Sequence, residues 1–121
     1  MPSDKSTFEE SLFFKKEEGD LPSHTLAMDI HFLLEDKKAH DILVLDIRKK
    51  ASFAEYLVIA SGHNARHVVA LGQHVLKTLK NEGIDGRVEG LPLGDWVLLD
   101  FGNVIVHLFR PEVRVRYQLE K

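Results

Sequence analysis

The sequence predicts an α/β (α+β) domain in which helices pack on a β-sheet of about five strands. Residues 94–109 carry two apolar runs on either side of Gly102-Asn103, and this pattern is typical of a tight β-hairpin. Residues 53–79 run from an apolar strand through a glycine turn into an amphipathic helix. A further apolar stretch, residues 41–47, supplies another strand. The length of 121 residues fits one domain with a single modest core.

Composition and charge exclude several classes of function. The chain has no cysteine, which rules out disulfides, thiolate metal sites and cysteine nucleophiles. Residues 1–20 contain three basic and six acidic residues, so they account for the whole net charge of −3, and we expect them to form a disordered acidic tail. The remaining single domain, residues 21–121, is neutral and predicts no nucleic-acid-binding surface. No stretch has the pattern of a signal peptide or a membrane span, so we expect a cytoplasmic protein without a membrane partner.

The first helix of the domain is expected directly after the tail. Ser23 is placed to cap it. Apolar residues then recur at helical spacing at Leu26, Ile30, Leu33 and Leu34. Lys37 and Lys38 follow at the end that carries the negative pole of the helix dipole. His24 and His31 have no third metal ligand in sight, so we expect both to face solvent.

Two strands follow this helix. Residues 41–47 (DILVLDI) are apolar on both faces, so we place them inside the sheet rather than at its edge. Residues 53–60 form the next strand, and the short connection between the two favours antiparallel pairing. Arg48, Lys49 and Lys50 make that connection a basic loop, for which plain solvation is a commoner role than binding.

A turn at residues 61–64 leads from the second strand into a helix that Gly83 ends. The helix has one apolar stripe, formed by Ala65, Val68, Gly72, Val75, Leu76 and Leu79. A strand, a glycine turn and a helix make up many phosphate sites, because free N–H groups at a helix start attract anions. The turn lacks the GxGxxG and GKS/T patterns. A nucleotide-binding enzyme that uses Ser61 to Asn64 nevertheless stays as the alternative function.

The register of the hairpin, which a short strand expected at residues 86–88 precedes, follows from its loop. With Gly102 and Asn103 as the two loop residues, Trp96 lies opposite Phe109. Because side chains alternate along a strand, one face is then wholly apolar and must be covered by helices. This face carries Val97, Leu99, Phe101, Val104, Val106 and Leu108.

The other face of the hairpin is mixed in character. It carries Trp96, Leu98, Asp100, Ile105, His107 and Phe109. Large apolar groups beside one carboxylate and one imidazole are typical either of a half-covered surface or of a docking platform. A slip of one residue in the pairing would exchange the two faces, so this assignment depends on the loop.

A short helix is expected to close the domain. Pro111 suits its first position, and Glu112 suits the positive pole of its dipole. Arg110, Arg114 and Arg116 make this segment the most basic one after the loop between the first two strands.

Every catalytic constellation in the chain is incomplete. His63 and His67 have the i, i+4 spacing of helical metal ligands, but neither a glutamate nor a third ligand accompanies them. His107 and Asp100 lack a serine elbow. Residues 46–48 (DIR) place an arginine where nucleotidyl transfer needs the second of two carboxylates. We therefore expect no catalytic residue, metal or cofactor, and a binding module rather than an enzyme.

Three stretches of the chain together resemble the ribosomal silencing factor (RsfS) family, also called the Iojap-related family. They are KKAHDILVLDIRKKASFAEYLVIASGHNARHV, EGLPLGDWVLLDFGNVIVHLF and PEVRVRYQLEK, spread over residues 37–121. They contain, in this order, the motifs DIxxLDxR, SFAxYxVIASG, DWVLLDFGxVIVH and PEVRxxYxLE. The resemblance implies a mixed sheet packed by helices, with a topology similar to that of nucleotidyltransferases but without their active site.

The resemblance also implies a function. Members of the family are known as translation repressors and not as enzymes. They bind the large ribosomal subunit at its fourteenth protein and sterically block joining of the small subunit when nutrients are limiting. They also self-associate, so a homodimer is a second expected assembly, whereas a nucleic-acid substrate is not expected.

Carried over to this chain, the resemblance places the partner surface at Trp96 of the DWV motif and at Tyr117 of the closing helix. The remaining platform residues are Leu98, Asp100, His107 and Phe109. We infer that Arg114 and Arg116 form a charged rim, which steers encounter more than it holds a complex. Besides the nucleotide-dependent enzyme, a self-assembling scaffold without a ribosomal partner stays open.

Overall fold

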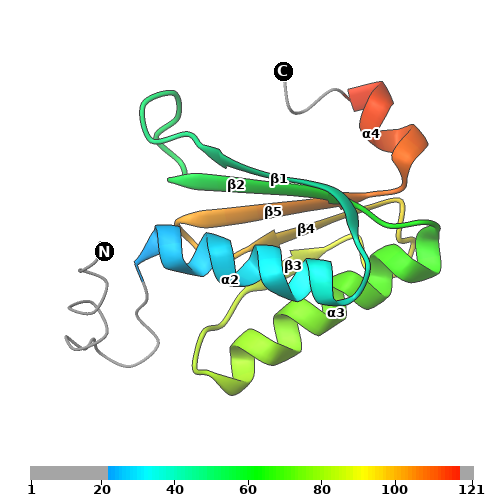
Figure 1. Cartoon of the computed structure of the whole chain (residues 1–121), viewed down its shortest axis with the longest axis horizontal. Coiled ribbons are helices and arrows are strands. Elements are labelled where there is room, and N and C mark those ends of the chain that lie inside the picture. Colours follow the sequence, from blue (N-terminus) through cyan, green and yellow to red (C-terminus); the bar gives the residue numbers. More distant parts are fainter. Residues whose placement is uncertain (1–21, 118–121) are drawn as a thin grey trace.

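The structure is a computed structural model that describes residues 22–117, and of residues 115–117 only the backbone. The acidic tail expected at residues 1–20 lies outside this range. The described residues form three helices and five strands (Figure 1). In chain order these are α2 (Ser23–Asp36), β1 (His40–Asp46), β2 (Tyr56–Ser61), α3 (Ala65–Asn81), β3 (Arg87–Glu89), β4 (Trp96–Asp100), β5 (Val104–Phe109) and α4 (Pro111–Tyr117).

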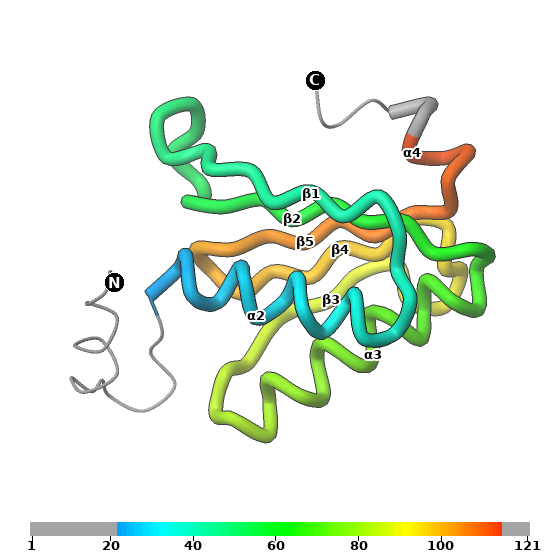
Figure 2. Tube along the Cα trace, in the orientation of Figure 1, coloured from blue at the N-terminus to red at the C-terminus, as the bar shows by residue number. Residues whose placement is uncertain are grey.

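The strands make one mixed sheet in the order β1-β2-β5-β4-β3, which can be followed along the trace in Figure 2. β2 and β5 are parallel, and every other pair of neighbours is antiparallel. This confirms the predicted fold class and the antiparallel pairing of the first two strands. Within residues 22–117, the helices are too short or too polar for any of them to cross a bilayer.

The prediction that residues 41–47 lie inside the sheet is wrong, because β1 is an edge strand that pairs only with β2. None of its residues is fully buried. An apolar residue on each face of a strand indicates cover above and below the sheet. It does not indicate a second neighbour in the plane of the sheet, and β1 has cover without that neighbour.

The two long helices begin differently. α2 starts at Ser23 itself, so the predicted cap is wrong: Pro22 precedes the helix, and the Ser23 hydroxyl donates a hydrogen bond to Glu55 instead. Asn64 caps α3, since its Oδ1 accepts the N–H of His67 at 2.9 Å. Of the two α2 histidines expected in solvent, His24 is exposed, whereas the one at position 31 is half-buried on the flank of the buried stripe.

The hairpin has the predicted register. Trp96 pairs with Phe109, and the loop closes where the N–H of Phe101 donates to the carbonyl of Val104 at 3.0 Å. Gly102 has a φ of 92°, which suits glycine at the first loop position of a type II′ turn. The apolar face of the hairpin lies in the main core, as expected.

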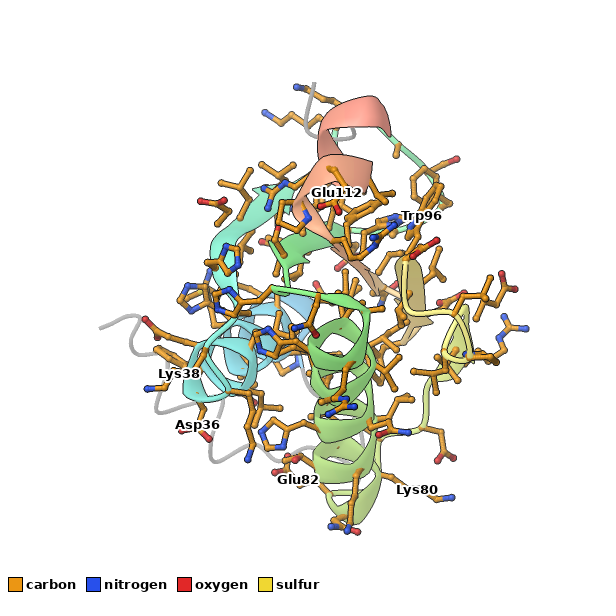
Figure 3. The ribbon with its side chains drawn as sticks, turned by 90° about the vertical axis from the view of Figure 1, so that its right-hand side faces the viewer. Asp36, Lys38, Lys80, Glu82, Trp96 and Glu112 are labelled. Carbon is orange, nitrogen blue, oxygen red and sulfur yellow. The ribbon has the colours of Figure 1, made fainter. Side chains whose placement is uncertain are left out.

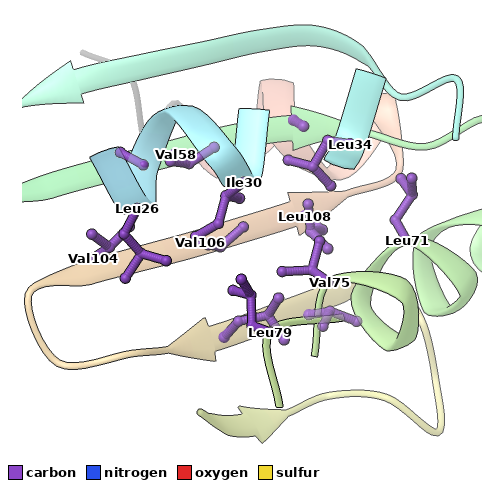
Figure 4. Close-up of a cluster of buried hydrophobic side chains, with 14 of the residues drawn as sticks. Leu26, Ile30, Leu34, Val58, Leu71, Val75, Leu79, Val104, Val106 and Leu108 are labelled. Atoms are coloured by element: carbon purple, nitrogen blue, oxygen red, sulfur yellow. The ribbon is translucent and has the colours of Figure 1, made fainter. Parts of the chain in front are cut away.

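The main core lies between the sheet and the pair α2 and α3. Figure 4 shows helix and strand side chains meeting there, among them Leu26, Ile30, Leu34, Val58, Leu71, Val75, Leu79, Val104, Val106 and Leu108. Most of these side chains have no exposed surface. Because α2 and α3 lie on one side, the opposite face of the sheet is left for α4 to cover.

Candidate functional site

The candidate site is the sheet face opposite α2 and α3, called here the open face. It includes Leu43, Leu45, Leu57, Ile59, Trp96, Leu98, Asp100, Ile105, His107 and Phe109, with Ser61 beside Phe109 and with Arg87 and Glu89 of β3 at its edge. Residues paired across neighbouring strands share a face, so the strand registers place these side chains together. Figure 3 shows α4 and Trp96 on this side of the sheet and the long helices on the other.

Trp96 is half-buried at the start of β4. Its indole Nε1–H donates a hydrogen bond to Nδ1 of His107 at 2.9 Å, across the β4–β5 pair. The indole ring lies 5.8 Å from the imidazole and 5.2 Å from the ring of Phe109, between ring centroids. Among the residues that the structure describes, two aromatic neighbours and one hydrogen bond therefore hold the indole in one orientation.

The protonation state of His107 supports this arrangement. Burial lowers the pKa of His107 to about 4, because a charged imidazole is poorly solvated there. The ring is therefore neutral at pH 7, and its Nδ1 keeps the lone pair that accepts the Trp96 proton. His107, one of the residues expected in the platform, therefore contributes to this surface by orienting Trp96.

Phe109 has no exposed surface, which corrects the expectation that it forms part of an exposed platform. It packs with Ile59 and with Val113 of α4 in a second, smaller core. Trp96 and the β1–β2 leucines at positions 45 and 57 border this cluster. α4 closes over this end of the sheet and buries Phe109, and the ring of Trp96 packs against this buried ring.

Leu98 and Asp100 continue the open face toward the hairpin loop. Both side chains are partly exposed. The Oδ1 of Asp100 accepts the N–H of Gly102 at 2.9 Å, so this carboxylate stabilises the loop. Its other oxygen, Oδ2, lies 3.8 Å from Nη2 of Arg87 on β3. Asp100 and Arg87 therefore give the open face a polar margin.

Arg114 is buried, so the expectation that it forms part of an exposed charged rim is wrong. Its Nη1 donates to the Asp41 carbonyl at 2.6 Å and to the Ser61 hydroxyl at 3.0 Å. The register between β1 and β2 shifts by one residue after His40, and Asp41 there has a φ of 52°. Arg114 satisfies the carbonyl at this bulge and ties α4 to both strands. The side chains of Tyr117 and Arg116 lie outside the described part.

Four apolar residues of the open face were not predicted from the sequence: Leu43, Leu45, Leu57 and Ile59. The alternation of the first two strands carries their signal, but the sequence does not show which strand pairs with the other edge of β2. Once β5 is placed there, Leu57 lies beside Ile105 and extends the apolar strip to β1. Leu43 at the outer end is 38% exposed.

The turn between β2 and α3, which carries the nucleotide alternative, is held by its own side chains. Asn64 caps the helix, as described above. His67 accepts the N–H of His63 on Nδ1 at 2.9 Å and donates from Nε2 to the Lys37 carbonyl at 2.8 Å. Among residues 22–114 no cluster of three metal-binding side chains occurs. These hydrogen bonds thus hold the turn and the start of α3 against the C-terminal end of α2.

Comparisons with known proteins agree on one family. A family model described as "Ribosomal silencing factor during starvation" matches residues 20–121. A Zymomonas mobilis protein named "Ribosomal silencing factor RsfS" is 47% identical over 89 residues, which are 73% of this chain and 67% of that one. A Mus musculus protein named "Mitochondrial assembly of ribosomal large subunit protein 1" is 34% identical over 93 residues, 74% of this chain but 41% of that protein.

A solved structure agrees as well. A crystal structure of a Chromobacterium violaceum protein matches this fold with a TM-score of 0.80 and 37% sequence identity. The match covers 83% of this chain and 84% of that one.

Proposed function

Because the chain belongs to the ribosomal silencing factor family, we propose that it represses translation by binding the large ribosomal subunit. In this proposal the open face docks on the fourteenth protein of that subunit and keeps the small subunit from joining. The repression operates during nutrient limitation. No catalytic step is required, since occupation of the joining surface is sufficient.

The names of the relatives support this proposal. The family description contains the words silencing and starvation, and the Zymomonas mobilis relative carries the silencing-factor name. The mouse relative is named for assembly of the ribosomal large subunit. A shared partner surface on the large subunit accounts for both kinds of name.

The observation that carries the proposal is the oriented Trp96 beside an apolar strip. A tryptophan that is half-buried and fixed in the free protein loses little conformational entropy on binding, and tryptophan is enriched among residues that dominate interfaces. Leu57 and Leu98 are also half-exposed on this face. A partner that covers them removes apolar surface from water, at about 25 cal/mol per Å².

Steric blocking is consistent with the size of the domain. A folded domain of about 100 residues has a radius of gyration of about 13 Å, hence a width of about 30 Å. A body of this width on the joining surface separates the subunits by far more than the contact distance of about 4 Å between packed atoms.

The experiment is sedimentation of purified large and small subunits in associating Mg²⁺, with the wild-type protein or a variant. Wild type is expected to co-migrate with the large subunit and to leave the subunits separate. Trp96→Ala is expected to bind at least about tenfold more weakly, as for a central aromatic anchor. The matched control is Phe32→Ala, which removes an aromatic ring that is 58% exposed on α2, across the sheet.

Each variant must first retain the circular dichroism of wild type. If folded Trp96→Ala binds the large subunit as well as wild type, the docking surface lies elsewhere. If wild type itself leaves subunit joining unchanged, the repression proposal is wrong. Calorimetric titration with nucleoside triphosphates and Mg²⁺ then tests the nucleotide-dependent alternative at the β2–α3 turn.

A further inference from the structure

The loop between β1 and β2, residues 47–55, is called here the basic loop. It stands at the end of the sheet opposite α4, and both rise on the same side of the sheet (Figure 1). β2 and β5 are each six residues long between these two ends, which corresponds to about 20 Å at 3.3 Å per residue. The open face therefore lies between α4 and the basic loop.

Arg48 fixes the base of the loop. Its Nε and Nη2 donate to the two carboxylate oxygens of Asp46 at 2.9 and 2.6 Å, and its backbone N–H donates to the same group at 3.0 Å. The guanidinium carbon lies 5.5 Å from the centre of the Tyr56 ring. Hydrogen bonds from Arg48 lower the pKa of Asp46 to about 2. The charge of Arg48 is thus balanced locally, and its side chain has a structural role.

Lys49 and Lys50 differ from Arg48. Both are exposed, and within residues 22–114 neither side chain has a hydrogen bond or an ion pair. Lys49 contributes only a minor part to the lowered pKa of Asp46. The carboxylate of Glu55, at the end of the loop, accepts the hydroxyl of Ser23 on α2. Two positive charges therefore project into solvent without a paired carboxylate.

Phe53 adds an exposed aromatic ring to the same loop. It is 69% exposed and follows Lys50 by three residues. Surfaces that bind unpaired RNA combine cations, which meet phosphates, with aromatic rings, which stack on bases. An acidic protein surface would also attract Lys49 and Lys50, and aromatic rings are enriched at protein interfaces too, but there they lie at the desolvated centre of the contact. Phe53 instead protrudes from a loop beside two exposed lysines, an arrangement that favours RNA over protein.

We propose that the basic loop contacts RNA of the large ribosomal subunit, with Lys49 and Lys50 at phosphates and Phe53 against an unstacked base. This inference rests on the proposed function, because the loop meets ribosomal RNA only when the domain is docked on the subunit. The neutral charge of the domain predicted no such contact. In a sum of charges over the domain, Asp46 and Glu55 offset the two lysines. In the structure, Asp46 instead binds Arg48, and Glu55 binds Ser23.

The test compares two double variants that remove the same charge. Lys49→Ala/Lys50→Ala alters the loop, and Lys77→Ala/Lys80→Ala alters two exposed lysines of α3 on the far side of the sheet, where Figure 3 labels Lys80. Affinity is measured for purified large subunits between about 50 and 200 mM KCl, a range over which phosphate contacts weaken strongly. In a second arm, affinity is measured for the isolated fourteenth protein without RNA.

We expect the loop variant to lose about tenfold in affinity for the subunit at the lowest salt. Its slope of log affinity against log salt should fall in magnitude by about 1.5, since each lost phosphate contact accounts for about 0.7–0.9. Affinity for the isolated protein should not change. The α3 control should change neither quantity, and Lys49→Arg/Lys50→Arg should retain the wild-type slope.

Other outcomes overturn the inference in distinguishable ways. Equal losses in both arms would assign the lysines to the protein partner. An unchanged affinity and slope for the subunit would show that the loop has no role in binding. If wild type binds in neither arm, the proposed function itself has failed. Phe53→Tyr should bind as wild type, and Phe53→Leu severalfold more weakly; equal affinities of these two variants would exclude stacking.

Discussion

The two faces of the sheet are built from the same alternating strands and end in different states. On the covered face, Val58 and Val106 have no exposed surface, because α2 and α3 complete the layer. On the open face, α4 reaches one end only. Ile59 and Phe109 are buried there, Trp96 at the border of that cluster is half-buried, and Leu57 and Leu98 are likewise only half-buried. The difference therefore follows both from the side chains, which are wholly apolar on only one face of the hairpin, and from the helices, which cover nearly all of that face.

This difference separates stability from recognition. Side chains at the centre of the covered face gain their full burial when the chain folds. Trp96, Leu57 and Leu98 on the open face gain part of it, and the remainder is available to a partner. Substitutions on the covered face should thus change the free energy of unfolding, and substitutions on the open face should chiefly change binding.

The largest effect is expected on the covered face. Ile30→Ala removes a fully buried side chain of α2 and should lower the free energy of unfolding by about 2–5 kcal/mol. Urea denaturation measures this change. The folded molecules should bind large subunits with wild-type affinity. A weaker affinity under conditions where nearly all molecules are folded would contradict the separation of the two faces.

The next effect concerns the junction between the faces. Arg114→Ala removes the donor to the Asp41 carbonyl and should lower the free energy of unfolding by about 1–3 kcal/mol, because a buried polar group is left without that partner. Thermal unfolding provides the measurement. Arg114→Lys is the control and should recover part of the loss. Equal stability of all three proteins would mean that water replaces the guanidinium without cost.

The pH dependence of stability should report on the open face. The pKa of His107 is about 4 in the folded protein and about 6.5 in an unfolded chain, so the unfolded state binds more protons between these values. The contribution of His107 to stability should be fully present above pH 6.5 and be lost as the pH drops toward 4, by on the order of 1–2 kcal/mol once solvent screening is allowed for. Denaturation at a series of pH values tests this, and His107→Gln should lack this component of the slope.

A smaller effect is expected from the bond that orients the indole. His107→Leu removes the acceptor for the Trp96 N–H and should weaken binding of large subunits about fivefold, the equivalent of about 1 kcal/mol for one hydrogen bond. His107→Gln retains an acceptor and should bind more tightly than His107→Leu. Co-sedimentation at several protein concentrations gives both affinities, and identical values would mean that the indole needs no orientation.

The smallest effect is expected on the exposed surface of α2, on the opposite side of the molecule from the open face. Phe32→Ala removes a ring that is 58% exposed on α2 and should change the free energy of unfolding by less than about 0.5 kcal/mol. Binding of large subunits should not change either. A measurable loss of binding would mean that the helical side of the molecule also meets the partner.

Local sequence patterns were sufficient to predict the hairpin and the part of the open face that the hairpin contributes. Its register depends on Gly102-Asn103, which are adjacent in the chain, and the alternation then places Trp96 and His107 on one face. That placement brings the indole N–H within reach of the imidazole, but the hydrogen bond itself was not predicted. The roles proposed for Tyr117 and Arg116 stay predictions, because their side chains are outside the described part.

Features that depend on distant contacts could not be predicted in the same way. Arg114 reaches the Asp41 carbonyl across 73 positions of sequence, and nothing near residue 114 indicates that partner. A basic residue on a short helix is usually exposed, so the sequence favoured a rim. The edge position of β1 was missed for a related reason, since its neighbours are set by the order of all five strands.

The hydrogen bond between Trp96 and His107 also gives the protein an intrinsic optical probe. Trp96 is the only tryptophan in the chain, so all indole fluorescence originates at the open face. Indole emission shifts to shorter wavelength when water is excluded, and it responds to loss of a hydrogen-bond acceptor. Docking of a partner and protonation of the imidazole therefore leave separate spectral signatures that can be followed in the unlabelled protein, with no added chromophore near the binding surface.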